Sequence, residues 1–72
     1  MHSHKNTQLV ISVLTKIANQ NNLSYKKVKK LFVVKGNLCI TGQFWELLKE
    51  LHPEKNYTEV YHCPDCDKFS LE

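Results

Sequence analysis

In the first third of the chain, apolar residues recur every three or four positions, which is the period of one face of an α-helix. Thr7, just before this stretch, is a residue type suited to cap a helix, and the polar pair Asn21–Asn22 interrupts the pattern. We therefore predict a first helix over residues 8–20 that packs one apolar stripe into the core. The stripe consists of Val10, Val13, Leu14 and Ile17.

A second amphipathic stretch, SYKKVKKLF, covers residues 24–32. Ser24 can accept a hydrogen bond from a backbone N–H at the start of this helix. One face is apolar, and the rest of the surface carries lysines that have no carboxylate partner at helical spacing. This pattern predicts either a solvated surface or a surface that binds anions. The lysines are Lys26, Lys27, Lys29 and Lys30.

The segment VVKGNLCITG, residues 33–42, permits two interpretations. Its central Lys-Gly-Asn triplet can form a hairpin turn, or Gly36 can be the left-handed residue that closes the second helix. We favour the second interpretation, with a short extended piece at residues 38–41. Cys39 lies in that piece among apolar neighbours, which favours a buried structural thiol.

A third helix, QFWELLKELH, begins at Thr41 or Gly42 in this interpretation, and Pro53 ends it. Trp45 lies beside the apolar stripe of this helix. It is therefore either an edge of the core or a contact residue for a partner, a role in which tryptophan is common. The stripe itself consists of Phe44, Leu47, Leu48 and Leu51.

The tail alternates between two faces and contains the sequence Cys-Pro-Asp-Cys, which together predict a β-hairpin. The expected fold is mainly α: a compact three-helix domain with a short C-terminal β-hairpin, and residues 1–72 form a single domain. Its parts are a flexible N-terminus at 1–6, a three-helix core at 7–53 and a hairpin at 57–71 that carries the Cys-Pro-Asp-Cys turn. The order is winged-helix-like only by analogy.

Charge is distributed unevenly along the chain, whose net charge is +3. Residues 1–36 contain seven lysines and no acidic residue, whereas residues 37–72 contain three lysines and all seven acidic residues. A chain with one basic and one acidic half can present its basic part to an anionic partner. All ten cations are lysine, which binds phosphate but lacks the planar fork that reads guanine.

Composition limits the function further. No apolar run reaches the ~20 residues that span a bilayer, and the N-terminus lacks the pattern of a secretory signal, so we expect a cytoplasmic protein with no membrane partner. Three cysteines, an odd number, favour reduced thiols over a disulfide framework. The chain has no Gly-rich phosphate loop, His-Glu-x-x-His or Gly-x-Ser-x-Gly motif, so we do not expect an enzyme.

The pair Cys63 and Cys66 forms the only motif in the sequence with residues typical of a metal or redox site, and three interpretations of it stay open. The pair can be two reduced thiols on a tight turn, half of a zinc site or a redox dithiol. A redox pair usually precedes a helix, for which the six residues after Cys66 are too few. A zinc ion would need further ligands from Cys39, from His52 or from a second chain.

The turn also resembles the opening of zinc ribbons and zinc fingers. The shared features are an aromatic residue before Cys-Pro-x-Cys and a basic residue followed by phenylalanine after it, here Tyr61, Lys68 and Phe69. Zinc ribbons usually have glycine after the second cysteine, where this chain has Asp67. The resemblance implies half of a zinc knuckle.

A second resemblance involves the helical part. An apolar first helix is followed by Asn22-Leu23-Ser24, which opens a helix ending near Leu31-Phe32, and Leu51-His52 precedes a tail with Tyr57. In this order, residues 8–60 resemble small bacterial proteins of unknown function encoded beside toxin-like genes. The resemblance implies a helical interaction protein of a toxin–antitoxin or phage-related system, to which the Cys-Pro-Asp-Cys tail is foreign.

These observations favour a small regulatory module that binds another protein, through Trp45 or through its acidic half. One alternative is a winged-helix-like regulator that lays the lysines at 26, 27, 29 and 30 against nucleic-acid phosphates. The other is a homodimer linked by zinc at Cys63 and Cys66. Zinc is the only cofactor that the sequence indicates.

Overall fold

The computed structural model describes residues 4–35 and 38–72, with the side chains of residues 34–40 outside the description. It confirms the mainly α fold with a C-terminal hairpin. The elements are α1 (Thr7–Gln20), α2 (Tyr25–Lys30), the π-helical turn η1 (Leu31–Lys35), α3 (Leu38–Leu51), β1 (Val60–Cys63) and β2 (Lys68–Leu71).

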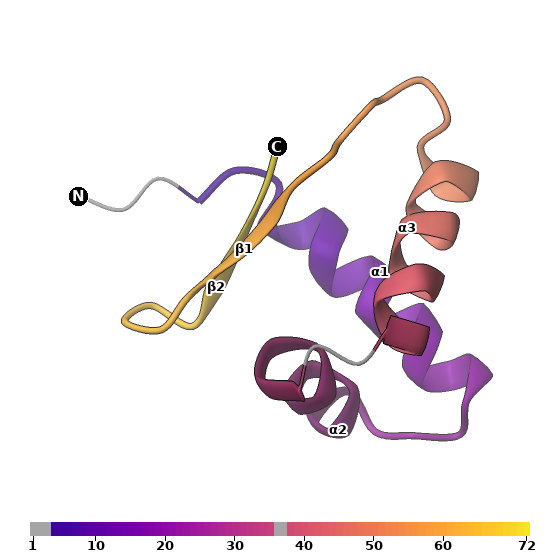
Figure 1. Cartoon of the computed structure of the whole chain (residues 1–72), viewed down its shortest axis with the longest axis vertical. Helices are drawn as coiled ribbons and strands as arrows, with labels where there is room; N and C mark the ends of the chain where they lie inside the picture. The colour runs from indigo at the N-terminus through magenta and orange to yellow at the C-terminus, as the bar shows by residue number, and fades with distance from the viewer. Residues whose placement is uncertain (1–3, 36–37) are drawn as a thin grey trace.

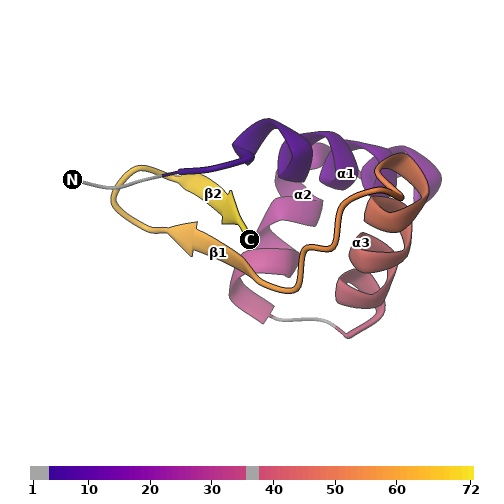
Figure 2. The same cartoon turned by 90° about the horizontal axis from the view of Figure 1, so that it is seen from above.

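The helices lie together on one side of the molecule, and the hairpin extends away from them (Figures 1 and 2). Helix α1 contacts α2, α3 and β2, so it joins the helical part to the sheet. The described part of the N-terminal segment, which precedes α1, runs beside β2 (Figure 2).

The predicted stripe of α1 is confirmed, because all four of its residues are fully buried. They meet α3 through Phe44, and they meet the hairpin through Phe69 and Leu71, which are 1% and 0% exposed. Burying a large apolar side chain stabilises the fold by about 1.5–3 kcal/mol, so these two residues anchor the hairpin. The core consists of Val10, Val13, Leu14, Ile17, Ala18, Val28, Phe44, Leu47, Leu48, Phe69 and Leu71.

The start of α1 differs from the prediction that Thr7 caps it. The cap position is Asn6, whose backbone is left-handed (φ 64°) and whose side chain makes no cap hydrogen bond. Thr7 is the first helical residue, and its hydroxyl donates to the backbone carbonyl of Phe69. A contact with the hairpin has therefore replaced the local cap.

The start of α2 agrees with the prediction, since Ser24 Oγ accepts a hydrogen bond from the backbone N–H of Lys27 at 3.2 Å. The helical path continues past the predicted end at residue 32 through η1. Phe32, in this π-turn, packs against Phe44 of α3 and Phe69 of β2, with ring centroids 5.0 and 6.4 Å apart. The turn thus brings an aromatic residue between the third helix and the hairpin.

The prediction of an extended piece at 38–41 is wrong, because α3 begins at Leu38 rather than at Thr41 or Gly42. β-Branched residues lower helix propensity only slightly, and packing of a continuous helix overrides that preference. Gly42 is an exposed position inside the helix, with nothing within 4 Å of an added Cβ. The predicted closing residue, Gly36, lies outside the described residues.

The hairpin pairs β1 with β2 in antiparallel register, Val60 opposite Leu71 and Cys63 opposite Lys68. Glu59 and Glu72 exchange backbone hydrogen bonds of 2.9 and 2.8 Å. Hydrogen-bonded and non-hydrogen-bonded pairs alternate along an antiparallel ladder. The backbone groups of Val60 and His62 therefore point away from β2, toward the other edge of β1.

Candidate functional site

Three potential metal ligands meet at the turn of the hairpin. One ligand atom each from His4, Cys63 and Cys66 lies within 4.8 Å of the others. His4 and Cys63 are partly buried and Cys66 is exposed. The two thiols come from the predicted turn, and the histidine comes from the opposite end of the chain. Imidazole and thiolate are both zinc ligands.

The position of His4 follows from three hydrogen bonds made by the next residues to β2. Leu71 N–H donates to the Lys5 carbonyl at 2.9 Å. Asn6 Nδ2 donates to the Leu71 carbonyl at 2.9 Å, and Thr7 Oγ1 donates to the Phe69 carbonyl. Residues 5–7 thus cover the outer edge of β2, and we call them the N-terminal strap. The segment 1–6 was expected to be a flexible end; residues 1–3 lie outside the described residues.

The turn itself has the backbone of a tight knuckle. Asp67 N–H donates to the Cys63 carbonyl at 2.8 Å, and Asp67 is left-handed with φ 56°. Asp is one of the few residue types besides glycine that tolerate this conformation. Asp67 thus stands where zinc ribbons usually have glycine, and its backbone adopts a conformation that favours glycine.

Partial loss of hydration and the adjacent Cys63 thiol raise the pKa of the exposed Cys66 thiol, and the charge of Lys68 opposes this increase. The thiol therefore keeps its proton at neutral pH and would have to release it in order to bind a metal ion. A hollow of about 420 Å³ borders the site, lined by His4, Cys63, Asp65 and Glu72 among others. The negative charges of Asp65 and Glu72 favour the approach of a cation.

The predicted co-ligands have other positions. His52 is half-buried beyond the end of α3 and does not belong to the cluster. The side chain of Cys39 lies outside the described residues. His62 neighbours Cys63 on the strand but packs against Phe69, with ring centroids 5.2 Å apart, as expected because alternate strand residues face opposite sides. His4 was missed because nothing near it in the sequence indicates the hairpin.

A polar link ties the hairpin turn to α2. The Lys29 ammonium pairs with one carboxylate oxygen of Asp67, and His62 Nε2 lies 2.8 Å from the other. Hydrogen bonds from Lys29 and His62 lower the pKa of Asp67. Of the four predicted anion-binding lysines, Lys29 is thus engaged within the chain, whereas Lys26, Lys27 and Lys30 are exposed.

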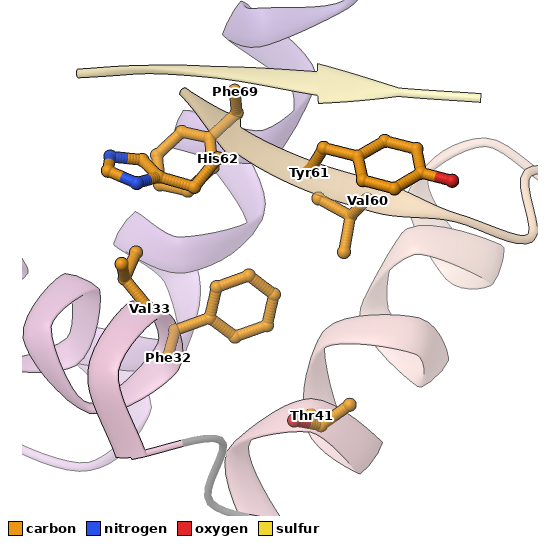
Figure 3. A pocket seen from close by; sticks show the side chains of 7 residues that line it. All are labelled: Phe32, Val33, Thr41, Val60, Tyr61, His62 and Phe69. Atoms are coloured by element: carbon orange, nitrogen blue, oxygen red, sulfur yellow. The ribbon is translucent and has the colours of Figure 1, made fainter. Parts of the chain in front are cut away.

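An apolar groove lies between β1 and the helices (Figure 3). It has a volume of about 240 Å³. Val60 from β1 and Phe32 from η1 point toward each other across it, and Thr41 of α3 lies at its far side (Figure 3). A second hollow shares Val33 and His62 with this groove. It is lined by Lys26, Lys29, Lys30, Val33, His62 and Asp67.

The two edges of the hairpin differ. The outer edge of β2 is covered by the N-terminal strap. The sheet of the described residues has two strands, so the outer edge of β1, formed by the backbone of Val60 and His62, has no strand beside it. Unpaired strand edges are places where another strand can add.

Trp45, the predicted contact residue, is half-buried. Its ring packs edge-on against Phe44, with centroids 5.1 Å apart and planes at 83°. It also lines a hollow of about 350 Å³ between α3 and residues 55–58, the segment that leads into β1 and includes Tyr57. Trp45 therefore combines a core contact with an accessible face.

Comparisons with known proteins find no matching family model, no similar curated protein and no similar solved structure. The resemblance of residues 8–60 to small bacterial proteins therefore stays a prediction. Within the described ranges, no helix combines the length and the apolar character needed to cross a membrane.

Proposed function

We propose that the protein is a non-enzymatic interaction module that binds an extended segment of a partner protein along β1. The observation that carries this proposal is the asymmetry of the hairpin, in which the strap covers β2 while β1 borders an apolar groove. In strand addition, backbone hydrogen bonds supply affinity and neighbouring pockets select alternate side chains. Val60 and His62 would supply the hydrogen bonds, and Phe32 and Val33 the apolar contact.

The charges around the groove indicate the chemistry of the partner segment. The groove continues into the hollow that contains Lys26, Lys29 and Lys30, with Asp67 as the acidic residue there. A segment with an apolar residue followed by acidic residues complements this surface. In a second copy of β1, with the sequence VYHC, the residues that directly follow the apolar Val60 are not acidic, so a different protein is the better partner.

The proposal is tested by selecting binders from a library of short random peptides with the reduced full chain. We expect the selected peptides to combine apolar and acidic residues. In a titration of ¹⁵N-labelled protein, they should protect the Val60 and His62 amides from hydrogen exchange. Protection of strand amides is the direct mark of a new backbone ladder.

A charge reversal with a matched control sharpens the test. Lys30→Glu should weaken peptide binding because it places a like charge beside the acidic residues. Lys16→Glu, at an exposed site on α1, should leave binding unchanged at equal net charge. Amide changes centred on Trp45 and Tyr57, or self-association of the free protein detected by light scattering, would refute binding at β1.

Nucleic-acid binding is a second candidate, favoured by the exposure of Lys26, Lys27 and Lys30. Each phosphate neutralised on duplex DNA would add about 0.9 to the log–log slope of affinity against salt. A mobility-shift titration with random duplex at two salt concentrations measures that slope. No shift at low salt with micromolar protein would eliminate this candidate.

A further inference from the structure

We propose that His4, Cys63 and Cys66 bind one zinc ion per chain on the outer face of the hairpin. The three residues supply three ligands, and the fourth position is open to an exchangeable ligand such as water. The proposal is independent of peptide binding at β1, which involves the other face and the other edge of the hairpin.

The spacing of the three residues suits a tetrahedral ion. With Zn–S distances of about 2.3 Å and Zn–N distances of about 2.0 Å, tetrahedral ligand atoms lie about 3.5–3.8 Å apart. The ligand atoms of the cluster are already within 4.8 Å of one another. Closing the remaining gap of about one ångström requires side-chain rotation and leaves the backbone in place.

The backbone on both sides of the site is fixed by interactions that do not depend on the metal. The strap holds the residue after His4 through Leu71 N–H donating to the Lys5 carbonyl. The bond from Asp67 N–H to the Cys63 carbonyl closes the turn that carries both thiols. Two segments from opposite ends of the chain thus present three ligands before any ion arrives, which lowers the ordering cost of binding.

The donor set selects the metal. Two thiolates and one imidazole favour zinc over the oxygen-seeking Mg²⁺ and Ca²⁺. Two thiolates neutralise the charge of Zn²⁺, while Asp65 and Glu72 line the hollow through which it would enter. A redox role for the pair is less favoured, because β2 rather than a thiol-activating helix follows Cys66.

Binding would join the N-terminal segment to the hairpin turn. The ion would connect His4 with Cys66 across residues that belong to opposite ends of the sequence, and so it would secure the strap over the edge of β2. Zinc should therefore raise the melting temperature of the protein, because a ligand that binds only the folded state stabilises that state.

The test is a titration of the reduced full chain with Co²⁺, which reports thiolate ligation by its near-ultraviolet charge-transfer band and its visible bands. We expect the bands to saturate at one ion per chain and to disappear when Zn²⁺ is added. Cys66→Ser, at an exposed position, should abolish them. His4→Ala should weaken binding by more than about tenfold, since loss of even a supporting contact to a ligand costs about that much.

His52→Ala is the matched control, because it removes a histidine outside the cluster and should leave binding unchanged. Circular dichroism establishes that each variant is folded, and His4→Ala leaves both thiols available if Cys66→Ser does not fold. The proposal is overturned by any of three results. These are no bands with the reduced protein, unchanged affinity in His4→Ala, or saturation at half an ion per chain with doubling of the mass.

Discussion

The helical part and the hairpin are held in place by different kinds of interaction. In the helical part, apolar residues at helical spacing are buried against one another, as in the fully buried stripe of α1. The hairpin has two fully buried anchors, Phe69 and Leu71, and is also held by polar contacts between residues distant in sequence. Those contacts are the strap on β2 and the link from Lys29 to Asp67.

This difference explains where the candidate chemistry lies. Packing of the helices buries their apolar faces but does not bring their polar side chains together. The contacts at the hairpin, in contrast, bring together side chains from the two ends of the chain. His4 reaches the thiols only because the strap follows β2. Functional groups are often carried on such connecting segments, which a rigid scaffold positions.

The largest expected effect comes from removing the anchor of the hairpin. Phe69→Ala should lower the free energy of unfolding by about 3–5 kcal/mol, because it leaves a cavity where a fully buried ring packs. Urea denaturation followed by circular dichroism measures this change. Tyr61→Ala, on the same hairpin at 51% exposure, is the control and should shift stability by only about 0.5 kcal/mol. Equal effects would contradict the anchoring role.

The next largest loss of stability is expected from a substitution in the N-terminal strap. Asn6→Ala loses the hydrogen bond to the Leu71 carbonyl and places alanine at φ 64°. The bond is worth about 0.5–1.5 kcal/mol, and the left-handed backbone costs about 1–2 kcal/mol. Asn6→Gly loses the bond but tolerates the conformation, so thermal unfolding should find Asn6→Gly the more stable variant. The reverse order would show that residue 6 is not held in this conformation.

In the helical part, Gly42→Ala should stabilise the protein by about 0.4–1 kcal/mol. Alanine restricts the unfolded chain and suits a helix interior, and an added Cβ at this position has nothing within 4 Å to meet. The measurement is the urea midpoint at unchanged slope. Destabilisation would contradict the placement of Gly42 in the interior of a helix that begins at Leu38.

The smallest effects concern the link at the turn. Asp67→Gly tolerates the left-handed backbone but loses the contacts to Lys29 and His62. Asp67→Ala loses the same contacts and also disfavours the left-handed backbone. Both variants should melt below the wild type, with Asp67→Ala the lower of the two. Asp67→Asn, which can adopt the same conformation, isolates the carboxylate charge. If all three melt together with the wild type, neither the conformation nor the link stabilises the turn.

The helices were largely predictable from sequence because their signal is local. The α1 stripe, the Ser24 cap and the hairpin around Cys-Pro-Asp-Cys all follow from spacing and residue type within short windows. The start of α3 was not predictable in this way. Residues 38–41 have only weak conformational preferences of their own, so the packing of the rest of the helix determines their conformation.

The candidate metal site was half predictable. The Cys63–Cys66 spacing indicated two ligands, but the third depends on hydrogen bonds between residues more than sixty positions apart in sequence. Thr7 shows why such contacts are hard to predict, because its hydroxyl could cap its own helix but donates instead to the Phe69 carbonyl. Metal ligands need not be close in sequence, so the remote position of His4 does not exclude it as the third ligand of such a pair.

The most direct test of this account is whether the strap places His4 beside the hairpin turn in the reduced, metal-free protein. Nuclear Overhauser measurements on the full chain can detect contacts between the ring protons of His4 and the β-protons of Cys63 and Cys66. We predict such contacts, together with slow exchange of the Leu71 amide that donates to Lys5. Random-coil shifts at residues 4–6 and a rapidly exchanging Leu71 amide would contradict the account.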